Sequence, residues 1–298
     1  MLRHLPCFII RPIITLLLSL NLVYWGSLII LGGVIKLLLP SQLKFKWSRV
    51  LESFMHAWAY INMLVIRCFN PIEFDVQGIE HLNTRNWYLL LANHQSWFDI
   101  MLISYLCINK MPAGRYFLKR ELLKIPFIGL AAWALDMPLM QRYSKQYLSK
   151  YPEKRGCDIA TTQKACEKFK FIPVTVINFV EGTRFTKQKH QLKQSPYRHL
   201  LPAKAGGIAF ALATMGQQFS GILNTTLCYP DNPEGAMHAA ACGKLKRLTV
   251  RIEFIPITTQ HLGDYDNDLA FKQGFQNWLN GLWQKKDIEL QKLRDKNQ

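Results

Sequence analysis

The sequence predicts an α/β domain that follows a membrane-embedded helical segment. Three observations support this prediction: a long uncharged run near the amino terminus, a later alternation of short apolar runs with amphipathic ones, and a strongly amphipathic stretch near the carboxyl terminus. Strands that alternate with helices are typical of α/β folds. The chain of 298 residues is 49% hydrophobic and 19% charged, which excludes a disordered chain, since such chains are rich in charge and poor in aromatic residues.

The uncharged run covers residues 12–35. Its 24 residues would form a helix about 36 Å long, which exceeds a hydrocarbon core of roughly 30 Å. A secretory signal peptide would have a shorter apolar core followed by small residues at a cleavage site, whereas this run leads into Lys36 and Pro40. We therefore expect an uncleaved membrane anchor.

The segment after this run leaves two membrane topologies open. Residues 41–51 mix basic with aromatic side chains, which suits the headgroup layer, and a second apolar run, residues 54–66, is short for a full span. The anchor, residues 1–70, is therefore one crossing helix plus an interfacial helix, or a re-entrant hairpin. Basic residues are more frequent after the first run than before it, which places the catalytic domain, residues 71–298, on the cytoplasmic side.

The region after residue 70 contains the predicted sheet. Five runs have the length and β-branched content of strands: residues 73–77, 88–92, 174–180, 222–229 and 249–256. Helical patterns are found at residues 159–169 and 208–215. The last helix is the clearest, with apolar residues at spacings of three and four: Phe271, Phe275, Trp278, Leu279 and Leu282. We expect it to pack on the sheet; the alternative is a helix that lies on the membrane.

The charge and cysteine content limit the class of protein. The chain carries 37 Lys+Arg against 20 Asp+Glu, a net charge of +17, which favours anionic lipid surfaces. Its seven cysteines are odd in number and form no CxxC pair, so we expect reduced thiols and neither a disulfide framework nor a zinc site. The sequence also lacks the GxSxG, GxGxxG, P-loop and HExxH motifs of other enzyme classes.

A polar motif directly follows the predicted strand 88–92. It contains His94 and Asp99, at the kind of strand end where active sites gather in α/β folds. If His94 lies in the turn before a helix and Asp99 in its first turns, the carboxylate can reach the ring. An aspartate bonded to one imidazole nitrogen fixes the tautomer and makes the other nitrogen a general base. Taken alone, the pair is also compatible with a structural histidine beside a helix-capping aspartate.

A second polar motif follows the strand at 174–180. Gly182 permits a tight turn, Thr183 offers a hydroxyl, and Arg184 offers a planar fork that suits a phosphate monoester. Glu181 could orient Arg184 or accept a hydrogen bond from a substrate hydroxyl. Further basic residues, which singly are ordinary surface charges, could together surround an anion: Lys119, Arg120, Arg142 and Lys204.

Four segments in a fixed order resemble one known family. NHQSWFD, KRELLKIPFIG, FVEGTRF and LPAKAGGIAFAL are similar to motifs of the lysophospholipid and glycerophosphate acyltransferases, typified by 1-acylglycerol-3-phosphate acyltransferase, and the chain looks most like a bacterial inner-membrane branch. The resemblance covers nearly the whole chain. It implies a glycerophosphate acyltransferase-like fold, which is a mixed, mostly parallel sheet flanked by helices.

The resemblance also implies an activity. It is the transfer of a fatty acyl group from acyl-CoA or acyl carrier protein to the free hydroxyl of 1-acylglycerol-3-phosphate, which gives phosphatidic acid, without cofactor or metal. His94 matches the general base and Asp99 the carboxylate that orients it. The residues that match the phosphate site are Glu181, Gly182, Thr183, Arg184, Lys119 and Arg142. The family commonly has proline where this chain has Val180.

Two alternatives remain at this point. The acceptor could be another lysophospholipid, such as lysophosphatidylglycerol or a lysocardiolipin. A different class would be a membrane-bound protein that holds anionic lipid or RNA on its basic surface. That class would not need His94 and Asp99 together, and the sequence has no recognisable RNA- or DNA-binding motif, so no nucleic-acid partner is expected. The implied location is the bacterial inner membrane.

Overall fold

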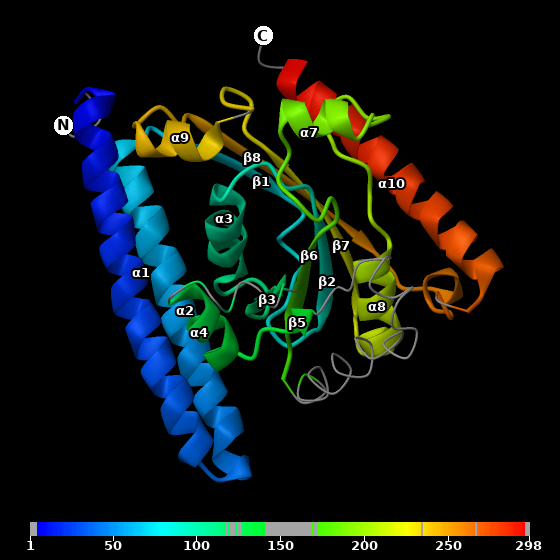
Figure 1. Ribbon diagram of the computed structural model, residues 1–298, viewed down its shortest axis with the longest axis horizontal. Coiled ribbons are helices and arrows are strands. Elements are labelled where there is room, and N and C mark those ends of the chain that lie inside the picture. Colours follow the sequence, from blue (N-terminus) through cyan, green and yellow to red (C-terminus); the bar gives the residue numbers. More distant parts are fainter. Residues whose placement is uncertain are drawn as a thin grey trace.

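The protein consists of a two-helix hairpin and an α/β domain (Figure 1). The structure, a computed structural model, describes residues 5–116, 118–119, 123, 125, 127–140, 169, 172–233, 235–265 and 267–295. The sheet is mixed and mostly parallel, with helices on both faces. The predicted fold class is confirmed.

The hairpin is formed by α1 (Cys7–Leu38) and α2 (Ser41–Phe69), which lie side by side along one flank of the molecule (Figure 1). Among the described residues, α1 is the one helix long and apolar enough to cross a membrane. The sequence suggested a basic segment and a separate apolar run, but α2 is continuous through both. Its buried residues recur mostly every three or four positions, from Ser48 to Phe69. The exposed basic residues Lys46, Arg49 and Arg67 lie on the other face of one amphipathic helix.

Ion pairs between described residues join the hairpin to the α/β domain. Lys36, at the end of α1, pairs with Asp136, and Glu52 of α2 pairs with Arg115. Arg115 is almost completely buried, so its charge would be costly without this carboxylate. The hairpin is therefore held against the domain by buried charge as well as by apolar packing.

The main sheet has the strand order β1-β8-β7-β2-β6-β3. Its strands are β1 (Glu73–Gln77), β2 (Tyr88–Ala92), β3 (Gly114–Tyr116), β6 (Thr175–Phe179), β7 (Gly221–Cys228) and β8 (Arg247–Ile255). All of its pairs are parallel except that of β7 with β8. A second, small sheet pairs β4 (Leu118–Lys119) with β5 (Leu139–Met140). The five predicted strands are present, whereas β3, β4 and β5 were not predicted.

Helices cover both faces of the main sheet (Figure 1). The hairpin face carries α3 (Phe98–Cys107), α4 (Ile128–Ala134) and α9 (Ala236–Ala241), and the other face carries α8 (Gly206–Met215) and α10 (Leu269–Asp295). Two short elements complete the described helices: α7 (Lys187–Leu192) and the 3-10 helix η5 (Thr259–His261). The helix expected at 159–169 lies outside the described residues except for Phe169.

Among the described residues, the two largest apolar clusters lie on opposite faces of the sheet, and a third lies between the hairpin and α4. Strands β2 and β7 are buried along their whole length, which explains why they read as continuous apolar runs rather than as alternating ones. Helix α10 contributes Phe275, Leu279 and Leu282 to the second cluster. The predicted packing of the last helix on the sheet is therefore confirmed.

The interpretation of the cysteines as reduced thiols is wrong for one pair. Cys7, at the start of α1, forms a disulfide with Cys242, just after α9. The two residues are 235 positions apart, and only the packing of α9 against the first turns of α1 brings them together. A sequence contains no signal for such a contact. Cys68, Cys107 and Cys228 are free thiols.

Candidate active site

The site lies at the edge of the sheet where β2 and β6 end. These strands are parallel neighbours, so the residues that follow them emerge at the same edge. Strand β2 leads into Asn93 and His94, and β6 leads into Val180 and Glu181. The two connections are joined directly, because the Phe185 backbone N–H donates to the His94 carbonyl at 2.7 Å.

His94 and Asp99 form a hydrogen-bonded pair. His94 lies in the turn before α3, and Asp99 lies in the first turn of that helix. The His94 Nδ1 atom is 2.8 Å from Asp99 Oδ2. The Asp99 side chain is fully buried, and 12% of the His94 side chain is exposed. The helix start thus brings together two residues that would face apart within one continuous helix.

Asp99 is held in place by further hydrogen bonds. Its Oδ2 atom also accepts from the backbone N–H groups of Gln95 at 2.7 Å and Ser96 at 2.8 Å. Its Oδ1 atom accepts from the Tyr229 hydroxyl at 2.5 Å. Burial raises the pKa of Tyr229 well above its usual value, so the phenol keeps its proton and remains a donor. These contacts fix both oxygens of the carboxylate.

The pair determines which imidazole nitrogen is basic. An ionised carboxylate only accepts hydrogen bonds. His94 Nδ1 therefore carries a hydrogen and donates it in the hydrogen bond to Asp99. The other nitrogen, Nε2, then has a free lone pair. The His94 ring stacks on Phe179 with 4.0 Å between centroids, which fixes the ring plane as the aspartate fixes the tautomer. This arrangement is that of an oriented general base.

Glu181 connects two backbone segments of the site. It is fully buried, and its two carboxylate oxygens accept from the backbone N–H groups of His94 at 2.9 Å and Leu201 at 3.0 Å. Burial raises the pKa of Glu181 to about 8, against the opposing effect of these two hydrogen bonds. The hydrogen bonds of Glu181 therefore go to backbone groups, and its suggested roles toward Arg184 or a substrate hydroxyl stay predictions.

Basic side chains gather around residues 182–184, which line the same cavity as His94. Arg184 is exposed, and its guanidinium carbon lies 4.7 Å from the Trp97 ring centroid. Lys189 of α7 donates to the Thr183 hydroxyl at 2.8 Å. Gly182 has a φ of +65°, and a Cβ atom there would lie 3.3 Å from the Lys204 side chain. The positive φ of this turn therefore favours glycine, and the Lys204 side chain packs close to it.

Of the remaining predicted basic residues, the structure describes only the backbone of Lys119. Lys119 lies in β4, where its backbone pairs with Met140. Arg120 and Arg142 lie outside the described residues. Two residues of the site, Tyr229 and Lys189, were not predicted. Tyr229 directly follows β7, which is parallel to β2, so the rule that polar residues gather at the ends of parallel strands could have found it. Lys189 had no such signal.

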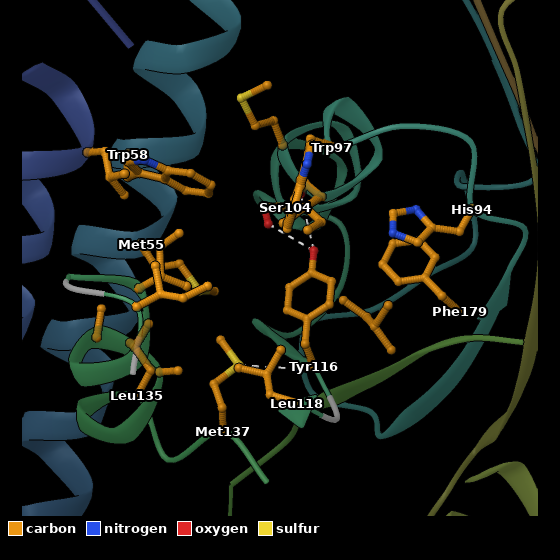
Figure 2. Close-up of a pocket in the computed structure, with 18 of the residues that line it drawn as sticks. Met55, Trp58, His94, Trp97, Ser104, Tyr116, Leu118, Leu135, Met137 and Phe179 are labelled. Carbon is orange, nitrogen blue, oxygen red and sulfur yellow. Dashed lines mark hydrogen bonds between the residues drawn. The ribbon is translucent and has the colours of Figure 1, made fainter. Parts of the chain in front are cut away.

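An elongated cavity begins at His94 and runs toward the hairpin (Figure 2). Its volume is about 510 Å³. In Figure 2, His94 and Phe179 lie on one side of the space, and Met55 and Trp58 of α2 lie opposite. We call the end lined by His94, Thr183 and Arg184 the polar end. The apolar end is lined by side chains from α1, α2 and α4: Leu22, Ile29, Met55, Trp58, Ile128 and Ala132, with Gly26.

Comparisons with known proteins agree with this geometry. A family model described as Acyltransferase matches residues 73–228, more than half of the chain. Lysocardiolipin acyltransferase 1 of Danio rerio is 20% identical over 285 residues, covering 90% of this chain and 68% of that protein. The 1-acyl-sn-glycerol-3-phosphate acyltransferase gamma of Mus musculus is 22% identical over 233 residues, and the match covers 74% of this chain and 57% of that protein. This chain therefore spans only part of the length of these relatives.

A solved structure has the same fold. The 1-acyl-sn-glycerophosphate acyltransferase PlsC from Thermotoga maritima superposes with a TM-score of 0.52 at 17% sequence identity. The match covers 93% of this chain and 98% of that one, so it extends over the hairpin as well as the α/β domain.

Proposed function

Because the chain belongs to the Acyltransferase family, we propose that it transfers a fatty acyl group from acyl-CoA or acyl carrier protein to the free hydroxyl of 1-acylglycerol-3-phosphate, giving phosphatidic acid in phospholipid biosynthesis. One observation carries this proposal. An imidazole with a free Nε2, oriented by Asp99, stands at the mouth of an apolar cavity and beside Arg184. A general base, an apolar cavity and a side chain that can bind a phosphate thus lie together.

The proposed reaction is a direct transfer. His94 Nε2 removes the proton from the acceptor hydroxyl as the hydroxyl oxygen attacks the thioester carbonyl. The new ester C–O bond forms, the C–S bond breaks, and the imidazolium returns the proton to the leaving thiolate. Atoms and charges balance without a metal or cofactor, so the proposed reaction needs neither. The buried Asp99 stabilises the imidazolium while it exists.

The two ends of the cavity suit different parts of the substrates. The apolar end can bury an acyl chain, and each buried methylene contributes about 0.8 kcal/mol. At the polar end, the Arg184 fork suits the phosphate of the acceptor, and Lys204 beside Gly182 adds a second positive charge. The reacting hydroxyl would then lie between phosphate and acyl donor, next to His94.

The location proposed for the enzyme follows from its substrates. Lysophospholipid and product are amphiphiles of the bilayer surface, whereas the donors are cytosolic. We therefore propose that α1 anchors the chain in the bacterial inner membrane with the α/β domain facing the cytoplasm. The net charge of +17 would favour contact with anionic lipids, and no nucleic-acid partner is needed to explain it.

The acceptor could also be another lysophospholipid. One relative is named for lysocardiolipin and others for 1-acylglycerol-3-phosphate. Arg184 and Lys204 would bind the phosphate of either kind of acceptor. The phosphate is therefore the element of the acceptor that the site supports most directly.

The test is an activity matrix with purified full-length protein. Several acyl-CoAs and an acyl carrier protein thioester would be combined with 1-acylglycerol-3-phosphate, lysophosphatidylglycerol, a lysocardiolipin and the phosphate-free monoacylglycerol. We expect transfer to phosphate-bearing acceptors and little to monoacylglycerol. His94→Ala should lower kcat by about 10²–10⁴-fold, whereas His81→Ala, at an exposed histidine, should leave it unchanged.

Two results would refute the proposal. Activity of His94→Ala close to that of the wild type would remove the general base. A lack of transfer to every lysophospholipid, with each donor and in lipid bilayers as well as detergent, would remove the reaction itself.

A further inference from the structure

Helix α10 carries a lysine that reaches the sheet beneath the catalytic histidine. Lys286 is only 1% exposed, on the face of the sheet opposite the hairpin. We propose that Lys286 is a positioning residue for acyl transfer, because it hydrogen-bonds to β2 and β7, the two strands that support the turn containing His94. The inference rests on the proposed function and assigns a role in it to the carboxyl-terminal helix.

The Lys286 ammonium bridges two strands through their carbonyl groups. Its Nζ atom donates to the Thr225 carbonyl in β7 and, at 3.4 Å, to the Leu91 carbonyl in β2. Leu91 lies three residues before His94. Leu91 is the second-last residue of β2, and Thr225 is the β7 residue that pairs with Ala92, where the pairing of the two parallel strands ends. One side chain therefore ties the two strands together at the end of their pairing.

The same strand ends are joined on the catalytic side by Asn93. Its side chain donates to the Leu227 carbonyl at 2.9 Å and accepts from the Leu227 N–H at 2.8 Å. Asn93 directly precedes His94 and follows β2. The His94 turn therefore starts from a strand pair that is bridged by Asn93 beyond the end of β2 and by Lys286 from α10.

A second connection runs from α10 to the backbone of His94. The Trp283 indole donates to the Leu201 carbonyl at 3.0 Å, and the Leu201 N–H donates to Glu181. Glu181 in turn accepts from the His94 N–H. Trp283 also lies next to Lys286, whose Nζ is 5.1 Å from the ring centroid. Two adjacent α10 side chains thus support the turn from two directions.

The bridge does not depend on the charge of the lysine. Burial lowers the pKa of Lys286 to about 7, whereas the acidic groups that face it oppose this shift: Glu289 of α10, Glu181 after β6 and Glu253 of β8. A neutral amine keeps two N–H donors, which equals the number of carbonyl acceptors. Both protonation states can therefore hold the two strands.

The position would not require an amine if its role were to fill space. Burying an ammonium is costly, and the neighbouring α10 residues Leu282 and Leu290 are apolar. A methionine would occupy a similar volume without this cost. The benefit of the lysine must therefore come from its hydrogen bonds to the strand ends, which a purely apolar side chain cannot make.

The experiment compares Lys286→Met and Lys286→Gln with Lys285→Met, the same change at the exposed neighbouring position. We expect both Lys286 variants to lower kcat by about 10- to 100-fold, since a small displacement of a catalytic group has an effect of this size, while acceptor KM changes little because the phosphate site is intact. Circular dichroism and unfolding curves establish that the assayed protein is folded. Lys285→Met should behave as wild type.

Hydrogen exchange gives a readout that does not need activity. Peptides that contain the His94 and Leu201 amides should exchange faster in the folded Lys286 variants than in the wild type, and peptides from α2 should not. This distinguishes the two proposals: if the wild type transfers no acyl group, the proposed function fails, while faster exchange at His94 still supports the positioning role. Folded variants with wild-type kcat and unchanged exchange would overturn it, as would variants that do not fold at all, since Lys286 would then be a folding determinant only.

Discussion

The polar and apolar ends of the cavity are built in opposite ways. At the polar end, hydrogen bonds to both Asp99 oxygens, a stacked Phe179 and the buried Glu181 determine the position of His94. At the apolar end, the lining side chains come from α1, α2 and α4 and contribute surface but few directed contacts. The polar end therefore fixes the positions of particular atoms, whereas the apolar end determines the shape of the cavity.

This difference predicts how each end responds to change. A hydrogen-bonded position is lost when one partner is removed, because the remaining buried groups are left unsatisfied. An apolar wall changes gradually with volume, because packing tolerates adjustment. Substitutions at the polar end should therefore affect the rate of the reaction, and those at the apolar end should affect which substrate fits.

The largest effect is expected for Asp99→Asn. The amide is nearly the same size, but it can present a donor to His94 Nδ1, which favours the wrong tautomer and removes the lone pair from Nε2. We expect kcat to fall by about 10²–10⁴-fold with little change in KM. Asp295→Asn, at an exposed end of α10, is the matched control. A loss of less than tenfold would show that the polar end is not built around this hydrogen bond.

A smaller effect is expected from Glu181→Gln, measured as the pH dependence of stability. The folded protein raises the Glu181 pKa from 4.5 to about 8, so between these pH values the folded state binds more protons than the unfolded state. The free energy of unfolding then falls as pH rises through this window, and glutamine abolishes that slope. Urea unfolding at several pH values should show the wild type losing stability relative to the variant. Parallel curves of unfolding free energy against pH for the wild type and Glu181→Gln would contradict this prediction. The control Glu73→Gln, at an exposed strand position, should give a curve parallel to that of the wild type.

The smallest effect on the chemistry is expected from Met55→Trp. Met55 lines the apolar end from α2 (Figure 2), and a larger ring would shorten the space. Long-chain donors should lose kcat/KM by an amount corresponding to about 0.8 kcal/mol per excluded methylene, while short-chain donors react at nearly the wild-type rate. Leu64→Trp on the exposed side of α2 is the control. An equal loss for all donors would show that the two ends are not independent.

The same contrast explains which elements could be predicted from the sequence. Strands β1 and β2 match their predicted bounds, because β1 alternates polar with apolar residues and β2 is a continuous apolar run, and turn residues enclose each. Strand β3 has only three residues, Gly114–Tyr116, and exists through its pairing with β6. The continuity of α2 was missed because its basic residues were interpreted as a boundary rather than as one face of a helix.

The site was predicted as far as its residues are close in sequence. His94 and Asp99 are five positions apart, and residues 181–184 form one turn, so local patterns identified them. Tyr229, Lys286 and the Cys7–Cys242 pair reach their partners only through the fold, over separations of 130, 195 and 235 residues. Local patterns therefore identify groups with chemical potential, whereas the groups that hold them in place require the tertiary structure.

Helix α1 contributes to the cavity as well as to the outer flank of the molecule. Leu22, Gly26 and Ile29 of α1 form part of the cavity wall, although α1 is also the helix suited to the bilayer. Helix α1 is thus one wall of the cavity, and a chain shortened by this helix would have a cavity open on that side. Under the proposed membrane attachment, one helix would serve both purposes: its buried face shapes the space for a lipid tail, and its exposed apolar side chains, such as Leu16 and Leu20, would meet the bilayer.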